Sequence, residues 1–93
     1  MIVAVEISFS FKREIDERDL ALELPAGASV VDAMHALASR YPQLRTRLFD
    51  GDGQILRHIN ALINGGNASF RQGFETVLRD GDRLTLLPPV GGG

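Results

Sequence analysis

The chain has 93 residues, a size that fits one compact domain with a single hydrophobic core. Hydrophobic residues make up 44% and charged residues 24%, ordinary globular proportions that exclude a disordered chain. Ten basic against twelve acidic residues give a net charge of −2, which is too balanced for a nucleic-acid-binding surface, so no nucleic acid partner is expected. The sequence has no cysteine, which excludes disulfides, thiolate metal sites and cysteine nucleophiles.

The hydropathy of the chain gives no sign of a membrane segment. The first six residues lack a basic stretch and reach a charge at Glu6, unlike a secretion signal. No apolar run approaches the roughly 18 residues that a membrane-spanning helix needs. We therefore expect a cytoplasmic protein that has no membrane partner.

Apolar and polar residues alternate near the N-terminus, which is the pattern of a half-buried β-strand. The apolar positions are Val3, Val5, Ile7, Phe9 and Phe11. A charged connector follows over residues 12–18. Leucines then return at every second position over residues 20–24, until Pro25 ends the pattern. These two segments predict a β-hairpin.

One amphipathic helix is predicted over residues 30–41. Ser29 is a suitable N-cap, and Asp32 three residues later gives a weak form of the capping box. Pro42 ends the helix because its ring does not fit a continuing helical backbone. A further short helical turn is expected over residues 43–49.

The second half of the chain alternates turns and strands. Residues 50–53, Asp-Gly-Asp-Gly, are a turn sequence, and a strand is predicted over residues 59–63. That strand ends at residues 64–66, Asn-Gly-Gly, which tolerate positive φ, and a short partner strand is expected near residues 67–70. A last strand is predicted over residues 83–87.

This order of elements, β, β, α, β, short β and β, predicts an α+β fold of the β-grasp, or ubiquitin-like, type. The first and last strands should lie side by side in a mixed sheet of four to five strands, packed on one main α-helix. Pro88 and Pro89 cannot donate ladder hydrogen bonds, so we expect one domain over residues 1–87 and a flexible, projecting tail over residues 88–93. The predicted core consists of Val3, Val5, Ile7, Leu22, Leu24, Val30, Met34, Leu37, Ile59, Ile63, Leu84 and Leu86.

Conventional catalytic and metal-binding patterns are missing from the sequence. His35 and His58 have no ligand partner at helical spacing and are interpreted as surface residues. Acidic pairs flank glycines in residues 50–52 and 80–82, without the twelve-residue ligand spacing of a calcium loop, and are interpreted as turn formers. We therefore expect no bound cofactor, no metal site and no catalytic side chain.

The candidate site is the C-terminal sequence itself, Pro88-Pro89-Val90-Gly91-Gly92-Gly93. Glycines lack a Cβ, so this segment can enter a narrow channel and a nucleophile can approach its last carbonyl carbon without steric shielding. From Leu87 to Gly93 the extended reach is about 20 Å at ~3.3 Å per residue. An ionised carboxylate is a poor electrophile, so such a site requires activation. The alternative interpretation is an inert, frayed terminus.

Two leucines next to the core positions indicate where a partner docks. Leu62 and Leu87 lie on the strand phase opposite to the neighbouring core residues, and a single helix cannot cover both faces of a sheet. We expect docking to use this open face together with the root of the tail. The predicted partner-binding residues are Leu62, Leu87, Pro89, Val90, Gly91 and Gly92.

The chain resembles the ThiS/MoaD family of ubiquitin-like sulfur carriers over nearly its whole length. The resemblance is sharpest in residues 58–65, His-Ile-Asn-Ala-Leu-Ile-Asn-Gly, and in the Pro-Pro-Val-Gly-Gly-Gly ending. The family ending is Pro-Pro-Val-Ala-Gly-Gly, from which Gly91 departs. The resemblance implies that a ubiquitin-activating-like enzyme uses ATP to adenylate the carboxylate of Gly93. A sulfur donor then converts the acyl adenylate to a thiocarboxylate, whose sulfur passes to a biosynthetic acceptor. The carrier supplies no catalytic side chain.

Length favours the molybdopterin and cysteine pathways over thiamine biosynthesis, and the ending then favours molybdopterin synthesis. Thiamine carriers usually lack most of residues 42–57, and the Pro-Pro-Val ending looks most like the small subunit of molybdopterin synthase, whose partner is the large subunit of that enzyme. Carriers for cysteine or thiamine biosynthesis are alternatives. A ubiquitin-like modifier joined to lysines through Gly93, and an interaction module with an inert tail, are further alternatives of different classes.

Overall fold

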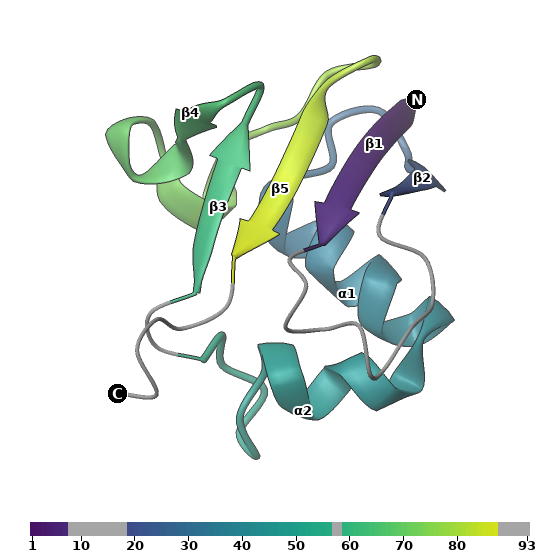
Figure 1. Cartoon of the computed structure of the whole chain (residues 1–93), viewed down its shortest axis with the longest axis vertical. Helices are drawn as coiled ribbons and strands as arrows, with labels where there is room; N and C mark the ends of the chain where they lie inside the picture. The colour runs from purple at the N-terminus through teal and green to yellow at the C-terminus, as the bar shows by residue number, and fades with distance from the viewer. Residues whose placement is uncertain (8–18, 57–58, 88–93) are drawn as a thin grey trace.

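The computed structural model describes residues 1–7, 19–56 and 59–87, in which a five-stranded sheet packs with one face on a helix (Figure 1). The elements are β1 (Ile2–Ile7), β2 (Asp19–Glu23), α1 (Val30–Arg40), α2 (Arg45–Leu48), β3 (Asn60–Ile63), β4 (Gly66–Asn67) and β5 (Arg83–Leu87). No helix in these three ranges is both long and apolar enough to cross a membrane.

The strand order is β2-β1-β5-β3-β4. The first and last strands, β1 and β5, lie side by side and parallel in the middle of the sheet, while the other neighbouring strands are antiparallel. Figure 1 shows α1 crossing behind the sheet; within the described residues no helix covers the opposite face, which is called the open face below. This topology confirms the β-grasp fold that the element order predicts.

Strand alternation decides which side chains enter the core. On β1, Val3, Val5 and Ile7 are all less than 5% exposed, and all twelve predicted core residues are buried. Phe9 and Phe11, the outer end of the predicted first strand, lie outside the described residues. The core also contains apolar residues outside the predicted core set: Leu20, Ala28, Ala33, Ala38, Leu44, Leu48, Phe49, Ala61, Ala68 and Leu78.

Helix α1 begins and ends where the sequence predicts, within one residue. The Ser29 hydroxyl accepts from the backbone N–H of Asp32 (3.3 Å), and the Asp32 carboxylate accepts from the backbone N–H of Ser29 (2.9 Å). These two bonds satisfy N–H groups that would otherwise lack a partner at the start of the helix. The last helical bond runs from the N–H of Tyr41 to the carbonyl of Leu37, and Pro42 follows.

The helical turn expected over residues 43–49 is present as a 3-10 turn, Pro42–Leu44, followed by α2. Its apolar residues are buried, so this segment extends the core beyond α1. The turn at residues 50–53 is held by Asp50, whose Oδ1 accepts the N–H groups of Asp52 (2.8 Å) and Gln54 (3.0 Å). The interpretation of Asp50 as a turn former is confirmed.

The short strand expected near residues 67–70 is corrected by the structure. β4 ends at Asn67, and Ala68–Phe70 forms a 3-10 turn. The physical reason is that the Asn67 side chain accepts the N–H of Ser69 (2.9 Å), which caps the turn and ends the ladder. The preceding turn from β3 uses Asn64 (φ 50°) and Gly65 (φ 86°) in the left-handed region, as the Asn-Gly-Gly sequence predicts.

Candidate functional site

Part of the predicted site falls on the described sheet, and part lies outside the described residues. Leu62 and Leu87 belong to β3 and β5. The remaining predicted residues, Pro89, Val90, Gly91, Gly92 and Gly93, lie in residues 88–93, outside the described ranges, as does His58. The separation of a domain over residues 1–87 from a tail over residues 88–93 therefore stays a prediction. The described surface is the one next to Leu87, the residue that precedes the tail in sequence.

The open face of the sheet carries the residues that alternate with the core. Leu87 faces Asn60 across β5 and β3, and Leu62 is paired with Thr85. Both leucines are half-buried on this face, as the strand phase predicts. Ile2, at the start of β1, adds an apolar side chain that is 49% exposed. The role of Leu62 and Leu87 in partner binding stays a prediction.

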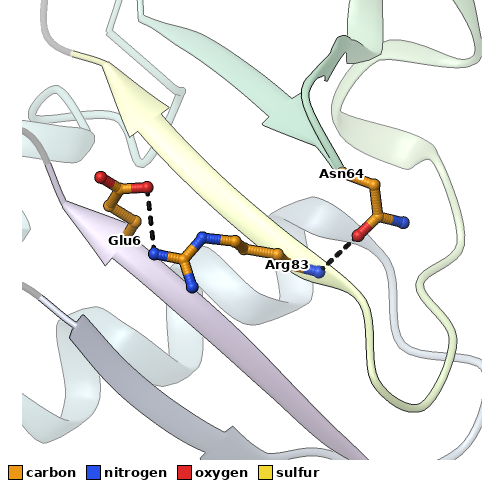
Figure 2. A network of polar contacts seen from close by, with 3 residues as sticks. All are labelled: Glu6, Asn64 and Arg83. Carbon is orange, nitrogen blue, oxygen red and sulfur yellow. Dashed lines mark hydrogen bonds and ion pairs between the residues drawn. The ribbon is translucent and has the colours of Figure 1, made fainter.

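A polar network lies on the same face (Figure 2). Arg83 Nη2 donates to Glu6 Oε1 at 3.1 Å across β5 and β1. The backbone of Arg83 is held by Asn64 on both sides: its N–H donates to Asn64 Oδ1 (2.9 Å), and its carbonyl accepts the N–H of Asn64 (2.8 Å). Asn64 Nδ2 also donates to Asp82 Oδ1 (2.9 Å). The sequence pattern did not predict this network, because it depends on the pairing of strands that are far apart in the chain.

The acidic residues of the 80–82 turn hold backbone groups. Asp80 Oδ1 accepts the N–H of Ile2 (2.7 Å), and Asp82 Oδ2 accepts the N–H of Arg79 (2.8 Å). Their interpretation as turn formers is confirmed. The bond of Asp80 also ties the start of β1 to the turn that precedes β5, which helps to fix the register of the central strand pair.

Electrostatic shifts in the described residues arise from helix capping. The backbone N–H of Ser29, and then its hydroxyl, hold the pKa of Asp32 below its ordinary value, because both hydrogen bonds favour the carboxylate.

Thr76 is buried, and its hydroxyl donates to the carbonyl of Gly73 (2.7 Å) and accepts the N–H of Gln72 (3.0 Å). Within the residues that the structure describes, no three His, Asp or Glu side chains gather as a metal site.

A groove of about 650 Å³ lies between α1, α2 and the turn after α2. His35 is exposed, as predicted, and its ring stacks on the buried ring of Phe49 with centroids 4.5 Å apart and an interplanar angle of 12°. The groove forms because residues 49–56 fold back on themselves through a bridge between Phe49 and Ile55. The Asp-Gly-Asp-Gly sequence predicts the turn, but no local pattern predicts the bridge that closes this segment. On another part of the surface, Phe70 is 88% exposed.

Comparison with known sequences identifies relatives that are named as modifier proteins or as sulfur carriers. The sequence model of the ThiS family matches residues 9–93. Small archaeal modifier protein 1 of Haloferax volcanii is 38% identical over 76 residues, 82% of this chain and 83% of that protein. Small archaeal modifier protein 3 of the same organism is 32% identical over 84 residues, 90% of each. Sulfur carrier protein CysO of Mycobacterium tuberculosis is 36% identical over 59 residues, 61% of this chain and 63% of that protein.

Solved structures share the same fold. The crystal structure of small archaeal modifier protein 1 from Haloferax volcanii superposes with a TM-score of 0.87 and 31% identity over 100% of both chains. The structure described as putative molybdopterin converting factor, subunit 1, from Pyrococcus furiosus has a TM-score of 0.76 and 26% identity, covering 97% of this chain and 99% of that one. By name, these relatives are small carrier, modifier and biosynthetic subunit proteins.

Proposed function

This chain belongs to the ThiS family, as its sequence predicts, and on that premise we propose that it is a sulfur carrier that works through the carboxylate of Gly93. The observation that carries the proposal is that the family match runs to residue 93 and so includes the Pro-Pro-Val-Gly-Gly-Gly ending. Relatives named as sulfur carriers support it. In this role the chain is a co-substrate of other enzymes and supplies no catalytic side chain.

The proposed chemistry has two steps. In the first, a carboxylate oxygen of Gly93 attacks the α-phosphate of ATP on a ubiquitin-activating-like adenylating enzyme, which forms an acyl adenylate and releases pyrophosphate. In the second, hydrosulfide or its equivalent from a sulfur donor attacks the carbonyl carbon, AMP leaves, and a thiocarboxylate remains. Neither step needs a cofactor bound to this chain, because the partner binds the ATP. Glycine at residues 91–93 keeps the carbonyl carbon free of side chains during both attacks.

For the acceptor of the sulfur we propose the large subunit of molybdopterin synthase. The Pro-Pro-Val ending supports this choice over cysteine or thiamine biosynthesis, and the Pyrococcus furiosus structural relative agrees with it. A second candidate function is protein modification, in which a lysine amine attacks the same adenylate. The two Haloferax volcanii relatives that carry the name of modifier favour it. Both functions begin with the same activated Gly93.

We propose that the partner docks on the open face beside the end of β5. Leu87 is the last described residue of the central strand and lies on that face, so an enzyme that takes up the following residues meets it first. Leu62 is on the neighbouring strand and shares the face with Leu87. Pro89, Val90, Gly91 and Gly92 would complete the interface inside the partner's channel.

The test is the chemical state of Gly93 after activation. The protein is incubated with ATP, the adenylating enzyme of its organism and sulfide, and its intact mass is measured. We expect the mass difference of one sulfur replacing one oxygen, located at Gly93 by fragmentation. Deleting Gly92 and Gly93 should abolish pyrophosphate release, while Gly93→Val, which places a branched side chain next to the carboxylate, should slow it.

The products distinguish the candidate functions. Lysine-linked conjugates without any thiocarboxylate would replace the carrier function by the modifier function. Pyrophosphate release by the truncated chain would refute the role of Gly93 in both. If the intact chain gives neither product with the adenylating enzymes of its organism, the chain is an interaction module with an inert tail.

A further inference from the structure

Glu6 and Arg83 place two opposite charges on the open face, across the two central strands. Glu6 is paired with Thr85 and Arg83 with Ala4, so the two side chains are diagonal neighbours on β1 and β5. Arg83 Nη2 lies 3.1 Å from Glu6 Oε1, and each side chain is 48% exposed (Figure 2). An ion pair that water reaches this easily contributes little to folding. The buried side chains and the ladder between β1 and β5 already hold these strands together.

The backbone that carries the Arg83 end of the charge pair is nevertheless fixed before any partner binds. Asn64 bonds both the N–H and the carbonyl of Arg83, so the guanidinium starts from a fixed backbone. Asn64 is itself fixed by its bond to Asp82. Ordering a side chain costs free energy on association, so a charge that starts from a fixed backbone and already contacts an opposite charge loses less freedom than one on a mobile segment.

The pair also lies within reach of any partner that docks at the root of the tail. Arg83 is four residues before Leu87 on a straight strand, which is about 13 Å at ~3.3 Å per residue. A standard interface buries about 800 Å² on each protein, a disc with a radius of roughly 16 Å. A partner centred on the end of β5 therefore covers the guanidinium. It also covers Glu6, which is closer to Leu87 along the strand direction.

We propose that Glu6 and Arg83 are specificity-determining residues for the adenylating enzyme, which presents an acidic side chain to Arg83 and a basic one to Glu6. The inference rests on the proposed function, because the proposed function names the adenylating enzyme as the partner on the open face. An enzyme with an apolar surface at this position would strip water from both charges without replacing its hydrogen bonds, and would bind weakly. The pair thus admits one class of adenylating enzyme and rejects others that accept a similar tail.

The test uses the full chain and single neutral variants, Glu6→Gln and Arg83→Gln, with the adenylating enzyme of the same organism. Affinity should fall by about thirtyfold or more for each, as for one removed partner of a covered charge pair. In pyrophosphate release, KM should rise while kcat stays near the wild-type value, because the carboxylate chemistry is untouched. The midpoint of thermal unfolding should move by only a few degrees, since the pair is half-exposed.

Two further sets of variants separate this effect from general charge effects. Arg45→Gln and Glu75→Gln remove the same charges from exposed positions on segments that contact α1, and they should keep wild-type affinity. The exchange Glu6→Arg with Arg83→Glu keeps the net charge and the attraction within the pair but reverses its direction. We expect it to fold normally and to bind no better than the single variants, because the enzyme then meets like charges.

The outcomes distinguish a failure of the specificity inference from a failure of the proposed function. If the wild type is activated and both neutral variants bind with wild-type affinity, the specificity inference is wrong and the proposed function stands. If the exchanged variant binds as well as the wild type, the enzyme does not distinguish which position carries the positive charge, and the inference is wrong. If no adenylating enzyme of the organism activates the wild type, the proposed function fails and this inference fails with it.

Discussion

Asn64 connects the end of β3 to the start of β5, and its replacement tests how far this one side chain holds the sheet together. Its backbone is in the left-handed region at φ 50°, which Asn tolerates better than other residues with a Cβ. Its side chain accepts from the N–H of Arg83 and donates to Asp82, both at 2.9 Å. Two substitutions separate these effects. Asn64→Ala removes the hydrogen bonds and keeps a Cβ, whereas Asn64→Gly removes the bonds and the Cβ together.

The expected loss of stability follows from these contacts. Two hydrogen bonds at an exposed position contribute about 1–2 kcal/mol in total. A left-handed alanine costs a further 1–2 kcal/mol or so, which gives about 2–4 kcal/mol for Asn64→Ala. In a domain of this size that lowers the midpoint of thermal unfolding by roughly 10–30 °C. Asn64→Gly avoids the backbone strain but gains about 0.4–1 kcal/mol of unfolded-state freedom, so it should be the milder variant by roughly 0.5–1 kcal/mol.

The assay is urea unfolding followed by far-ultraviolet circular dichroism, with the three free energies of unfolding compared at one temperature. Wild-type stability in both variants would show that the hydrogen bonds of Asn64 contribute nothing. An alanine variant equal to or more stable than the glycine variant would refute the backbone argument, because only the Cβ distinguishes them. A large change in the denaturant slope would mean that the native state itself has changed.

Two further predictions concern the helix start and the docking face. Because Ser29 lowers the pKa of Asp32 from 3.8, the stabilisation from this carboxylate should be complete above pH 3.8 and should be lost as pH falls through the lower folded-state pKa. Asp32→Asn should therefore remove that part of the pH dependence of the free energy of unfolding. An unchanged pH dependence would contradict the capping assignment. Leu62→Glu and Leu87→Glu should weaken binding of the adenylating enzyme more than they lower stability, because both side chains are half-buried on the open face. Dissociation constants, measured for the same variants as the free energies of unfolding in urea, check this prediction. Normal binding by both variants would place the interface elsewhere.

The sequence predicts the central features of the fold because they are local. A period of two in β1 and β5 assigns Val5 and Leu84 to the buried face, since one face of each strand meets the helix. Ser29 and Pro42 mark the helix because capping and proline act on their immediate neighbours. The element order then restricts the topology to the β-grasp. Each of these steps uses information within a few residues along the chain.

The features that the sequence does not predict depend on contacts across the chain. Phe49 is buried because residues 49–56 fold back against α1, which no periodicity signals. β4 is shorter than expected because one side chain, Asn67, caps the next turn. The ion pair of Glu6 and Arg83 follows from the register of β1 against β5, which are separated by most of the chain. For the candidate site, the roles of Leu62 and Gly93 remain predictions founded on strand phase and family membership.

The place of β5 in the sheet has a consequence for protein synthesis. Among the described strands β5 comes last in the chain, yet it separates β1 from β3, so the sheet cannot close until residues 83–87 have been made. A chain cut short before Leu87 lacks the central strand, exposes the apolar surface meant for it, and becomes a target for proteases. Residues 88–93 follow directly. Folding therefore depends on translation past residue 87, because a chain that stops earlier lacks all or part of the strand that joins β1 to β3.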